Sequence, residues 1–369
     1  MNQNRLFIVA TVLTGFAIAL VSALILLDPI MRFIVYEQTE LVPGTVTYEQ
    51  WVQPTIDIYF QAYLFNLTNP IEFQAGEKPI LHQLGPYTYK ERRFKKDIIP
   101  QAMPSTLQYK EVKEYHFKPA MSAGLESDVV TTVSLGYLAI DTKFGWLPAV
   151  IDRMIALLEQ WVGEHLIVRK TVGEILWGYE DPFLVFLRRM NVPVPSTMIG
   201  LYLGKNGTDD GPVEVYANNK DPENFGHIYK YRGSRNLLCW TTQQANQING
   251  SDGSLFHPFM HWSEHPYVFS ADICRSIQLQ PDSMIDMYGV PVIRYLPYTD
   301  TFSSPLTTEK NRGFCIHWPN CLKDGVFDVS TCIPGAPIAM SPPHLQYVSC
   351  LVYFHCNDSQ LMQIGFDPL

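Results

Sequence analysis

The chain opens on an apolar stretch, LFIVATVLTGFAIALVSALILL, which runs from Leu6 to Leu27. These 22 residues include no charged side chain. As a helix they would be about 33 Å long, enough to cross a hydrocarbon core of about 30 Å. Fourteen of them are Leu, Ile, Val or Phe, so insertion into a bilayer is favoured by about 5 kcal/mol. A cleavable signal peptide has an apolar core of only about 7–15 residues. The stretch therefore predicts an uncleaved transmembrane helix.

The flanks of this helix predict its orientation. Residues 1–5 carry Arg5 and no acidic residue, whereas Asp28 and Pro29 follow the helix on its other side. Because positive charge is retained in the cytosol, we expect residues 1–5 to be a cytosolic leader and residues 28–369 to lie in the lumen or outside the cell. Four N-glycosylation sequons agree with this orientation because all of them follow the helix. They begin at Asn66, Asn206, Asn249 and Asn357.

Composition predicts a packed, disulfide-containing body beyond the helix. Charged residues make up 17% of the chain and aromatic residues 13%, which argues against disorder. The net charge of −9 gives no electrostatic basis for binding nucleic acid. An odd number of cysteines in an oxidising compartment leaves at least one thiol unpaired within the chain. The seven are Cys239, Cys274, Cys315, Cys321, Cys332, Cys350 and Cys356.

The order of patterns predicts an α+β ectodomain. Residues 59–118 read as strands, with short aromatic and β-branched runs between turn pairs. Apolar residues at helical spacing follow, and further short helices are predicted at 172–177 and 182–190. Beyond residue 200 the chain again reads as strands and turns. We therefore expect a β-rich domain with a helical insertion at about 145–190. The first helix of this insertion contains Leu147, Ile151, Met154 and Leu158.

This first helix is apolar over more than half of its circumference, and two interpretations stay open. The helix is either buried between its neighbours, or it leaves an apolar surface that docks a protein or lipid partner.

A cationic cluster also has two interpretations. It is either a solvated strand or hairpin edge, where lysines deter pairing, or a docking patch for anionic ligands. The cluster comprises Lys90, Arg92, Arg93, Lys95 and Lys96.

No pattern in the sequence predicts catalysis or a cofactor. His257, His261 and His265 are spaced four apart, but Pro258 and Pro266 argue against one continuous helix. We interpret these histidines as turn or surface residues. The sequence contains no nucleophile elbow, phosphate loop or dinucleotide fingerprint. We therefore expect a protein that is not an enzyme, with no cofactor and no metal.

Seven segments resemble the class B scavenger receptors, a family that includes fatty-acid translocase and lysosomal integral membrane protein type two. They run in the same order as in the family, over about residues 45–344. The segments are YFQAYLFNLTNPIEF (59–73), KPILHQLGPYTYKE (78–91), TVGEILWGYEDP (171–182), GKNGTDDG (204–211), NQINGSDGSLFHPF (246–259), YVFSADICRSI (267–277) and GVFDVSTCIPGAPIAMSPPH (325–344).

The resemblance implies a glycosylated ectodomain with an antiparallel β-barrel core, an apical helical bundle and a tunnel for lipids. It implies a receptor for lipids, lipoproteins or anionic particles in the lysosomal or plasma membrane. One branch of the family instead escorts a lysosomal hydrolase through the helical head. The resemblance also pairs Cys274 with Cys332, and Cys315 with Cys321. The family usually has a cysteine where this chain has Ala245, while Cys239 lies nearby.

The resemblance ends at His344, and residues 345–369 diverge from the family. Their longest charge-free apolar stretch, residues 348–354, is far too short to form a second membrane span. We therefore expect an incomplete barrel in a truncated splice form, a fragment or a flawed gene model. An inactive product is the corresponding alternative. The oligomeric state stays open.

Overall fold

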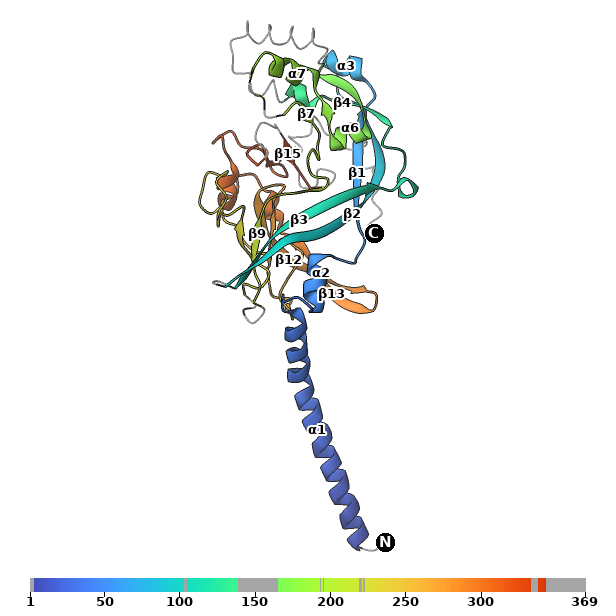
Figure 1. The fold of residues 1–369 in the computed structure, drawn as a ribbon, viewed down its shortest axis with the longest axis vertical. Coiled ribbons are helices and arrows are strands. Elements are labelled where there is room, and N and C mark those ends of the chain that lie inside the picture. Colours follow the sequence, from blue (N-terminus) through green and yellow to red (C-terminus); the bar gives the residue numbers. More distant parts are fainter. Residues whose placement is uncertain are drawn as a thin grey trace.

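The structure, a computed structural model, describes residues 3–102, 105–138, 165–192, 194, 196–218, 221, 223–332 and 338–342. Helix α1 (Gln3–Thr39) projects away from the rest of the chain (Figure 1). Within it, Thr11–Thr39 is long and apolar enough to cross a membrane, with a mean hydropathy of 2.2. The helix continues past Leu27, where the sequence predicted its end. Asp28 does not interrupt it, because its carboxylate accepts a hydrogen bond from Arg32 Nε one turn later, at 2.8 Å.

The largest sheet is antiparallel and is built around one long strand, β2 (Leu81–Gln101). Residues 81–91 of β2 pair with one neighbouring strand, and residues 89–101 pair with another. The sheet has the order β1-β2-β3-β9-β10, and β8 also pairs with β3. These strands confirm the strand prediction for residues 59–118. The other members are β1 (Ile58–Leu67), β3 (Thr106–Phe117), β8 (Thr208–Asp209), β9 (Val213–Tyr216) and β10 (Ile228–Tyr231).

Smaller antiparallel sheets complete the strand content. One has three strands in the order β11-β12-β13, and three have two strands each. Within the described ranges every sheet is open, so the fold is a mixed α+β arrangement. The strands are β11 (Tyr267–Ser270), β12 (Arg275–Met287) and β13 (Val290–Pro297); β4 (Val129–Val133) with β5 (Ile167–Thr171); β6 (Tyr179–Glu180) with β7 (Met198–Ile199); and β14 (Phe327–Asp328) with β15 (Ala339–Met340).

Short helices follow signals that are visible in the sequence. Helix α6 (Val172–Trp177) begins with a capping box, in which Thr171 Oγ1 accepts the Glu174 N–H and the Glu174 carboxylate accepts the Thr171 N–H. Helix α7 (Pro182–Arg189) is capped by Asp181. Both confirm predicted helices. The others are α2 (Val46–Val52), α3 (Pro70–Gln74) and the 3₁₀ turns η1 (Pro119–Met121), η2 (Thr299–Phe302) and η3 (Glu309–Phe314).

Two hydrophobic clusters form the core of the ectodomain. One lies near the end from which α1 leaves and joins α2 to β3, β9 and β10 through Trp51, Tyr109 and Val215. The other joins β1 and β2 to β4 and α6 through Tyr89, Val130 and Val172. Figure 1 shows α3, α6 and α7 at the end opposite α1.

Candidate ligand-binding site

The cationic cluster lies on β2, and its side chains point to both faces of the sheet. Lys90, Arg92 and Lys96 alternate with more buried residues and face solvent; the Arg92 side chain is 56% exposed. Arg93 and Lys95 face the interior, and the Lys95 side chain is 0% exposed. The period of two along a strand separates the five cations in this way. They therefore do not form one continuous patch.

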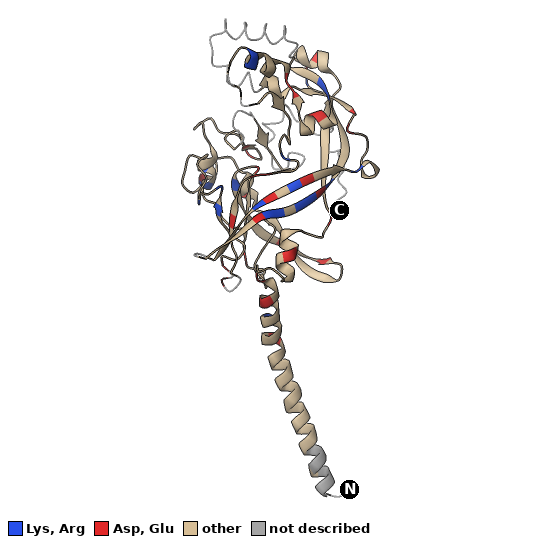
Figure 2. Ribbon diagram, in the orientation of Figure 1, with Lys and Arg blue, Asp and Glu red and all other residues tan. Residues whose placement is uncertain are grey.

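Each of these five cations has a carboxylate partner. Two pairs lie directly opposite in the β2–β3 register, Arg92 with Glu114 and Lys95 with Glu111. Figure 2 shows positive and negative residues side by side on these strands. Residues 92–96 of β2 pair with β3 on one side, whereas β1 pairs with β2 only up to Glu91. Within the described residues this part of the cluster therefore lies at a strand edge of the sheet. The pairs are Lys90–Asp57 (2.5 Å), Arg92–Glu114 (3.6 Å), Arg93–Glu91 (2.6 Å), Lys95–Glu111 (3.1 Å) and Lys96–Asp209 (3.1 Å).

The inner face of the sheet carries a charged network, and Tyr109, Glu111 and Asp252 of this network line a cavity of about 320 Å³. Lys95 Nζ donates to the Trp51 carbonyl at 3.0 Å and to Glu111 at 3.1 Å. Tyr109 donates its hydroxyl hydrogen to Asp252 at 2.8 Å. Burial alone would raise the pKa of Asp252, but the charge of Lys95 and hydrogen bonds from Ser254 and Tyr109 lower it below its usual value. The charges that surround this cavity are therefore largely compensated.

A second cavity, of about 250 Å³, differs because its wall is largely apolar. It lies between the residues that follow Cys274 and the loop closed by Cys315 and Cys321. It is smaller than the roughly 300–1,000 Å³ of pockets for drug-sized ligands. A short ligand or one end of a longer ligand would fit. Its apolar wall includes Trp240, Ile273, Phe314, Leu322, Phe327 and Val329.

Arg275 is the cation in the wall of this apolar cavity, and only 8% of its surface is exposed. Its guanidinium lies over the rings of Phe314 and Phe327, at 3.9 and 4.9 Å from their centroids. Arg275 Nη2 donates to Asn311 Oδ1 at 2.7 Å. Among the described residues no carboxylate lies within ion-pair distance of it. Burial lowers the pKa of Arg275 to about 10, although the charge of Asp300 raises it.

This arrangement favours an anion, because an ionised group that is buried without a counter-ion is costly. The acidic residue Asp328 also lines the cavity, but its carboxylate accepts the Ser330 N–H at 3.0 Å. Sequence reasoning missed Arg275. The available signal was a single cation directly after Cys274, at the start of a strand whose next residues alternate between polar and apolar.

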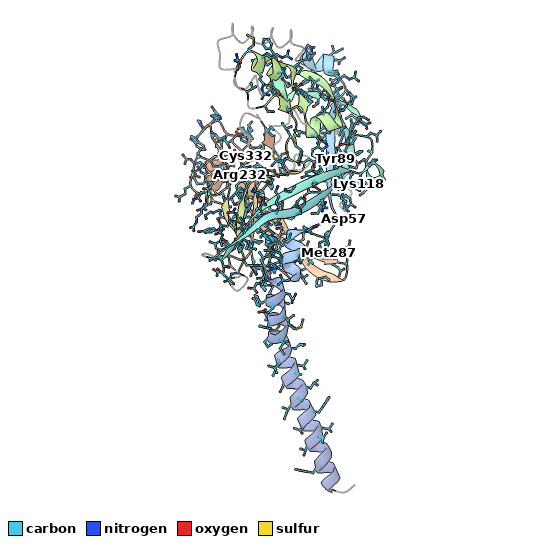
Figure 3. The ribbon with its side chains drawn as sticks, in the orientation of Figure 1. Asp57, Tyr89, Lys118, Arg232, Met287 and Cys332 are labelled. Atoms are coloured by element: carbon cyan, nitrogen blue, oxygen red, sulfur yellow. A yellow bond between two sulfur atoms is a disulfide. The ribbon has the colours of Figure 1, made fainter. Side chains whose placement is uncertain are left out.

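Two disulfides flank the apolar cavity. Cys274 is bonded to Cys332 and Cys315 to Cys321, with Cα–Cα distances of 5.6 and 5.4 Å. These are the pairs that the family resemblance implied, and Figure 3 labels Cys332. Cys239 has a free thiol. Cys350 and Cys356 lie outside the described residues.

Gly313 lies opposite Ala245. A Cβ atom on Gly313 would lie 2.7 Å from the Cβ atom of Ala245. The position where the family usually has a cysteine therefore faces a glycine in this chain. The two small residues occupy a site where larger side chains would not fit without a shift.

The structure describes three of the four sequon asparagines and only part of the predicted helical head. Asn206 is exposed, whereas Asn66 and Asn249 are half-buried. The Oδ1 atom of Asn66 accepts the Thr131 N–H at 2.8 Å. Three sequon positions thus lie at or near the surface, and glycosylation stays a prediction. Outside the described residues lie Asn357 and the predicted docking residues Leu147, Ile151, Met154 and Leu158.

The three regularly spaced histidines lie in irregular segments beside turns, and His261 and His265 are exposed. His257 Nε2 lies 2.6 Å from Glu264 Oε2, and His265 Nδ1 lies 2.9 Å from the Tyr298 hydroxyl. His261 Nδ1 lies 2.9 Å from Ser263 Oγ. In the part of the chain that the structure describes, no group of three or more His, Cys, Asp or Glu residues is placed to hold a metal ion.

Comparison with known proteins assigns the family. The model of the CD36 family matches residues 8–349. The chain belongs to the CD36 family. The resemblance to class B scavenger receptors is thereby confirmed, and the CD36-family chain is an ectodomain anchored to a membrane by its apolar N-terminal helix.

Several relatives align with most of the chain. Lysosome membrane protein 2 of Homo sapiens is 35% identical over 322 residues, which are 85% of this chain and 66% of the relative. Lysosome membrane protein 2 of Mus musculus is 34% identical over 325 residues, 86% of this chain and 66% of the relative. Scavenger receptor class B member 1 of Mus musculus is 30% identical over 337 residues, 89% of this chain and 64% of the relative. The chain thus spans just under two thirds of the length of these relatives.

Proposed function

We propose that this CD36-family chain is a non-enzymatic membrane receptor of the scavenger type. Its ectodomain would bind lipids, lipoproteins or anionic particles. The observation that carries the proposal is the family match over residues 8–349, with relatives that include Scavenger receptor class B member 1. Helix α1 supports it because the helix would hold the binding domain at a membrane. Residues 1–5 would lie in the cytosol, and the sequons would be glycosylated in the lumen.

The proposal includes a finer architecture for residues 28–344, with residues 345–369 as a divergent tail. The core would be an antiparallel barrel, and the helical head at about 145–190 would be its apex. The antiparallel pairing throughout the main sheet supports this arrangement. The position of α6 and α7 opposite α1 also supports it (Figure 1). Leu147, Ile151, Met154 and Leu158 would dock a partner at the apex.

We place the contact with anionic particles on the outward cations of β2. Lys90, Arg92 and Lys96 face solvent, and their acidic partners share the same surface. Exposed ion pairs contribute only about 0–1 kcal/mol, so an anionic particle can compete with the carboxylates for the cations. Lys95 and Arg93 stabilise the inner network and would not touch a large particle.

One experiment tests this contact in two directions. Replacing Lys90, Arg92 and Lys96 together by Gln is expected to weaken binding of anionic liposomes to cells that display the receptor. Replacing the partners, with D57N, E114Q and D209N, removes the competing carboxylates and is expected to strengthen binding. Neutral liposomes are the control. Equal binding by both variants and the wild type would exclude this surface as the anion site.

The apolar cavity would accept the acidic end of an amphipathic ligand at Arg275. Replacing Ile273 by Phe would fill the cavity while keeping the cation, and replacing Arg275 by Gln would remove the cation while keeping most of the space. Both variants are expected to lose saturable binding of octanoate, measured by calorimetry on the full chain in detergent. Unchanged affinity in both variants would exclude the cavity as a ligand site.

An alternative function is that of a sorting receptor for a lysosomal hydrolase, bound through the helical head. One observation favours it. The relatives named Lysosome membrane protein 2 are 34–35% identical to this chain, against 28–31% for those named Scavenger receptor class B member 1. Variants of residues 147–158 that lose a hydrolase cargo but keep lipid uptake would favour this alternative.

A further inference from the structure

The hairpin formed by β12 and β13 exposes large apolar side chains at its tip. Met287, Tyr288 and Val290 are 54%, 101% and 58% exposed. Asp286 is the only charged residue between positions 284 and 293, and its carboxylate accepts the Gly289 N–H within the turn at 2.9 Å. Apolar side chains grouped in this way on a surface typically mark a contact with a partner or a membrane.

Tyr288 occupies a turn position to which its side chain is poorly suited. Met287 pairs with Val290, so the turn contains only Tyr288 and Gly289. Their φ angles are 55° and 83°. Two residues with positive φ form a type I′ turn, which strongly prefers Asn-Gly or Gly-Gly. A bulky aromatic residue in this region is a conformational outlier. Neither turn geometry nor packing accounts for a fully exposed tyrosine here.

The hairpin projects from the end of the ectodomain that meets the membrane anchor. Figure 1 shows β13 beside α2 at the end from which α1 leaves, and Figure 3 labels Met287 there. No described element covers the tip. The distance of the hairpin from the bilayer therefore depends on which residue of α1 is the last one inside the membrane.

The apolar surface of α1 continues almost to the ectodomain. Phe33 and Ile34 are exposed, and Tyr36 contacts the ring of Phe259 with 5.8 Å between centroids. The segment that is long and apolar enough to span a membrane, Thr11–Thr39, extends past Leu27, and its charges Asp28 and Arg32 pair with each other at 2.8 Å. If the span ends at Ile34 and not at Leu27, about 20 helical residues before it cross a hydrocarbon core of about 30 Å. The bilayer surface would then lie close to Tyr36. Trp262, three residues after Phe259 in the sequence, is also exposed, and tryptophan is enriched at membrane interfaces.

We propose that the tip of the β12–β13 hairpin enters the interfacial layer of the bilayer that α1 spans. The ring of Tyr288 would lie at the level of the headgroups, with Met287 and Val290 beside it. Tyrosine suits this layer because its ring is apolar and its hydroxyl group is polar. The tip carries no basic residue, so the contact is apolar and does not require anionic lipid. The ectodomain would touch the membrane at the anchor and at the hairpin. This contact does not depend on the receptor function proposed above.

Photocrosslinking tests the contact with the full chain in nanodiscs of phosphatidylcholine. A p-benzoylphenylalanine residue replaces Tyr288 in one sample and Ile71 of α3 in the other. Ile71 is a matched control because it is 77% exposed and lies at the opposite end of the ectodomain (Figure 1). We expect a phosphatidylcholine adduct at position 288, in several-fold higher yield than at position 71, with little change between low and high salt.

The variant Tyr288→Asn separates the contact from folding. Asparagine is favoured in this turn, so the hairpin should keep its shape and the melting temperature should not fall. With the photoreactive residue at position 287, the variant is expected to lower the lipid adduct several-fold. Equal lipid adducts at positions 71 and 288 would overturn the proposal. Adducts at position 288 only with a second protein chain would overturn it as well.

Discussion

Arg275 and Lys95 are both buried cations, but their surroundings differ. Lys95 has Glu111 and a backbone carbonyl as partners, whereas Arg275 has an amide and two aromatic rings. Removing one partner of a buried ion pair is expensive, because the other charge stays uncompensated. Among the described residues Arg275 has no carboxylate within ion-pair distance and feels only the more distant charge of Asp300, which is why we propose a role in ligand binding for Arg275 and a role in stability for Lys95.

His227 is expected to make the ectodomain less stable at acidic pH. Burial and the neighbouring His257 lower the pKa of His227, although Asp221 raises it. Below the pKa of about 6.5 of an unperturbed histidine, the unfolded chain binds a proton that the folded chain binds less readily. Stability therefore falls as the pH drops from 6.5, by at most about 1.4 kcal/mol per pH unit for this group.

Thermal melting between pH 7.5 and 5 checks this expectation. The variant His227→Gln removes the titrating ring, so its melting temperature should depend less on pH than that of the wild type. The variant His116→Gln is the matched control, because it removes a histidine whose side chain is 62% exposed. An identical pH dependence in the wild type and in His227→Gln would contradict the assignment.

Gly313 is expected to reject even a methyl group. An added Cβ would lie 2.1 Å from Thr242 Oγ1 and 2.7 Å from Ala245 Cβ. Overpacking of this kind typically costs about 1–3 kcal/mol, so Gly313→Ala should lower the free energy of unfolding by that amount. Gly173→Ala in α6 is the control, since its nearest neighbour would lie at 3.6 Å. Equal stability of the two variants in urea unfolding would count against the close packing of Gly313.

Among the elements, those with local signals could be predicted from the sequence. Helix α6 is an example, because Thr171 and Glu174 form its capping box within one turn. For α1 the sequence predicts an end at Leu27, because the charged Asp28 follows, but the helix continues to Thr39. In the structure Arg32 compensates that charge one turn later. Spacing along a helix can reveal such a pair, but hydropathy alone does not.

The cationic cluster shows why sites formed by several strands are harder to predict. Its partners come from Asp57, Glu111, Glu114 and Asp209 as well as from β2 itself. Their proximity depends on the β2–β3 register and on β8, neither of which can be read from a local pattern. The sequence identified the cations, but it did not identify the carboxylates that pair with them.

Lys95 and Lys96 are adjacent on β2 and are expected to differ strongly when replaced. Lys95→Met leaves Glu111 and Asp252 without their buried cation, which should cost about 3–5 kcal/mol. Lys96→Met breaks only an exposed pair with Asp209 and should cost less than about 1 kcal/mol. The free energy of urea unfolding measures both. Similar losses in the two variants would contradict the division of the cluster into an inner and an outer face.

At the scale of the molecule, the sequence predicted an anchor, a strand-rich body and helices within it. The family match over residues 8–349 confirms the resemblance that guided this prediction. A closed barrel and an apical bundle stay predictions, because the described sheets are open and the first predicted helix lies outside the described residues. The apolar cavity could not be foreseen, since its wall combines residues from 240 to 329.

The most direct test of this account is the electrophoretic mobility of the carbonate-resistant protein before and after treatment with peptide N-glycosidase. Membranes from cells that express the full chain are washed with alkaline carbonate, and the pellet is analysed. We predict that the protein stays in the pellet and that the enzyme increases its mobility, with a smaller shift in the variant Asn206→Gln. A protein that is released by carbonate and carries no glycan would contradict the anchored, luminal ectodomain.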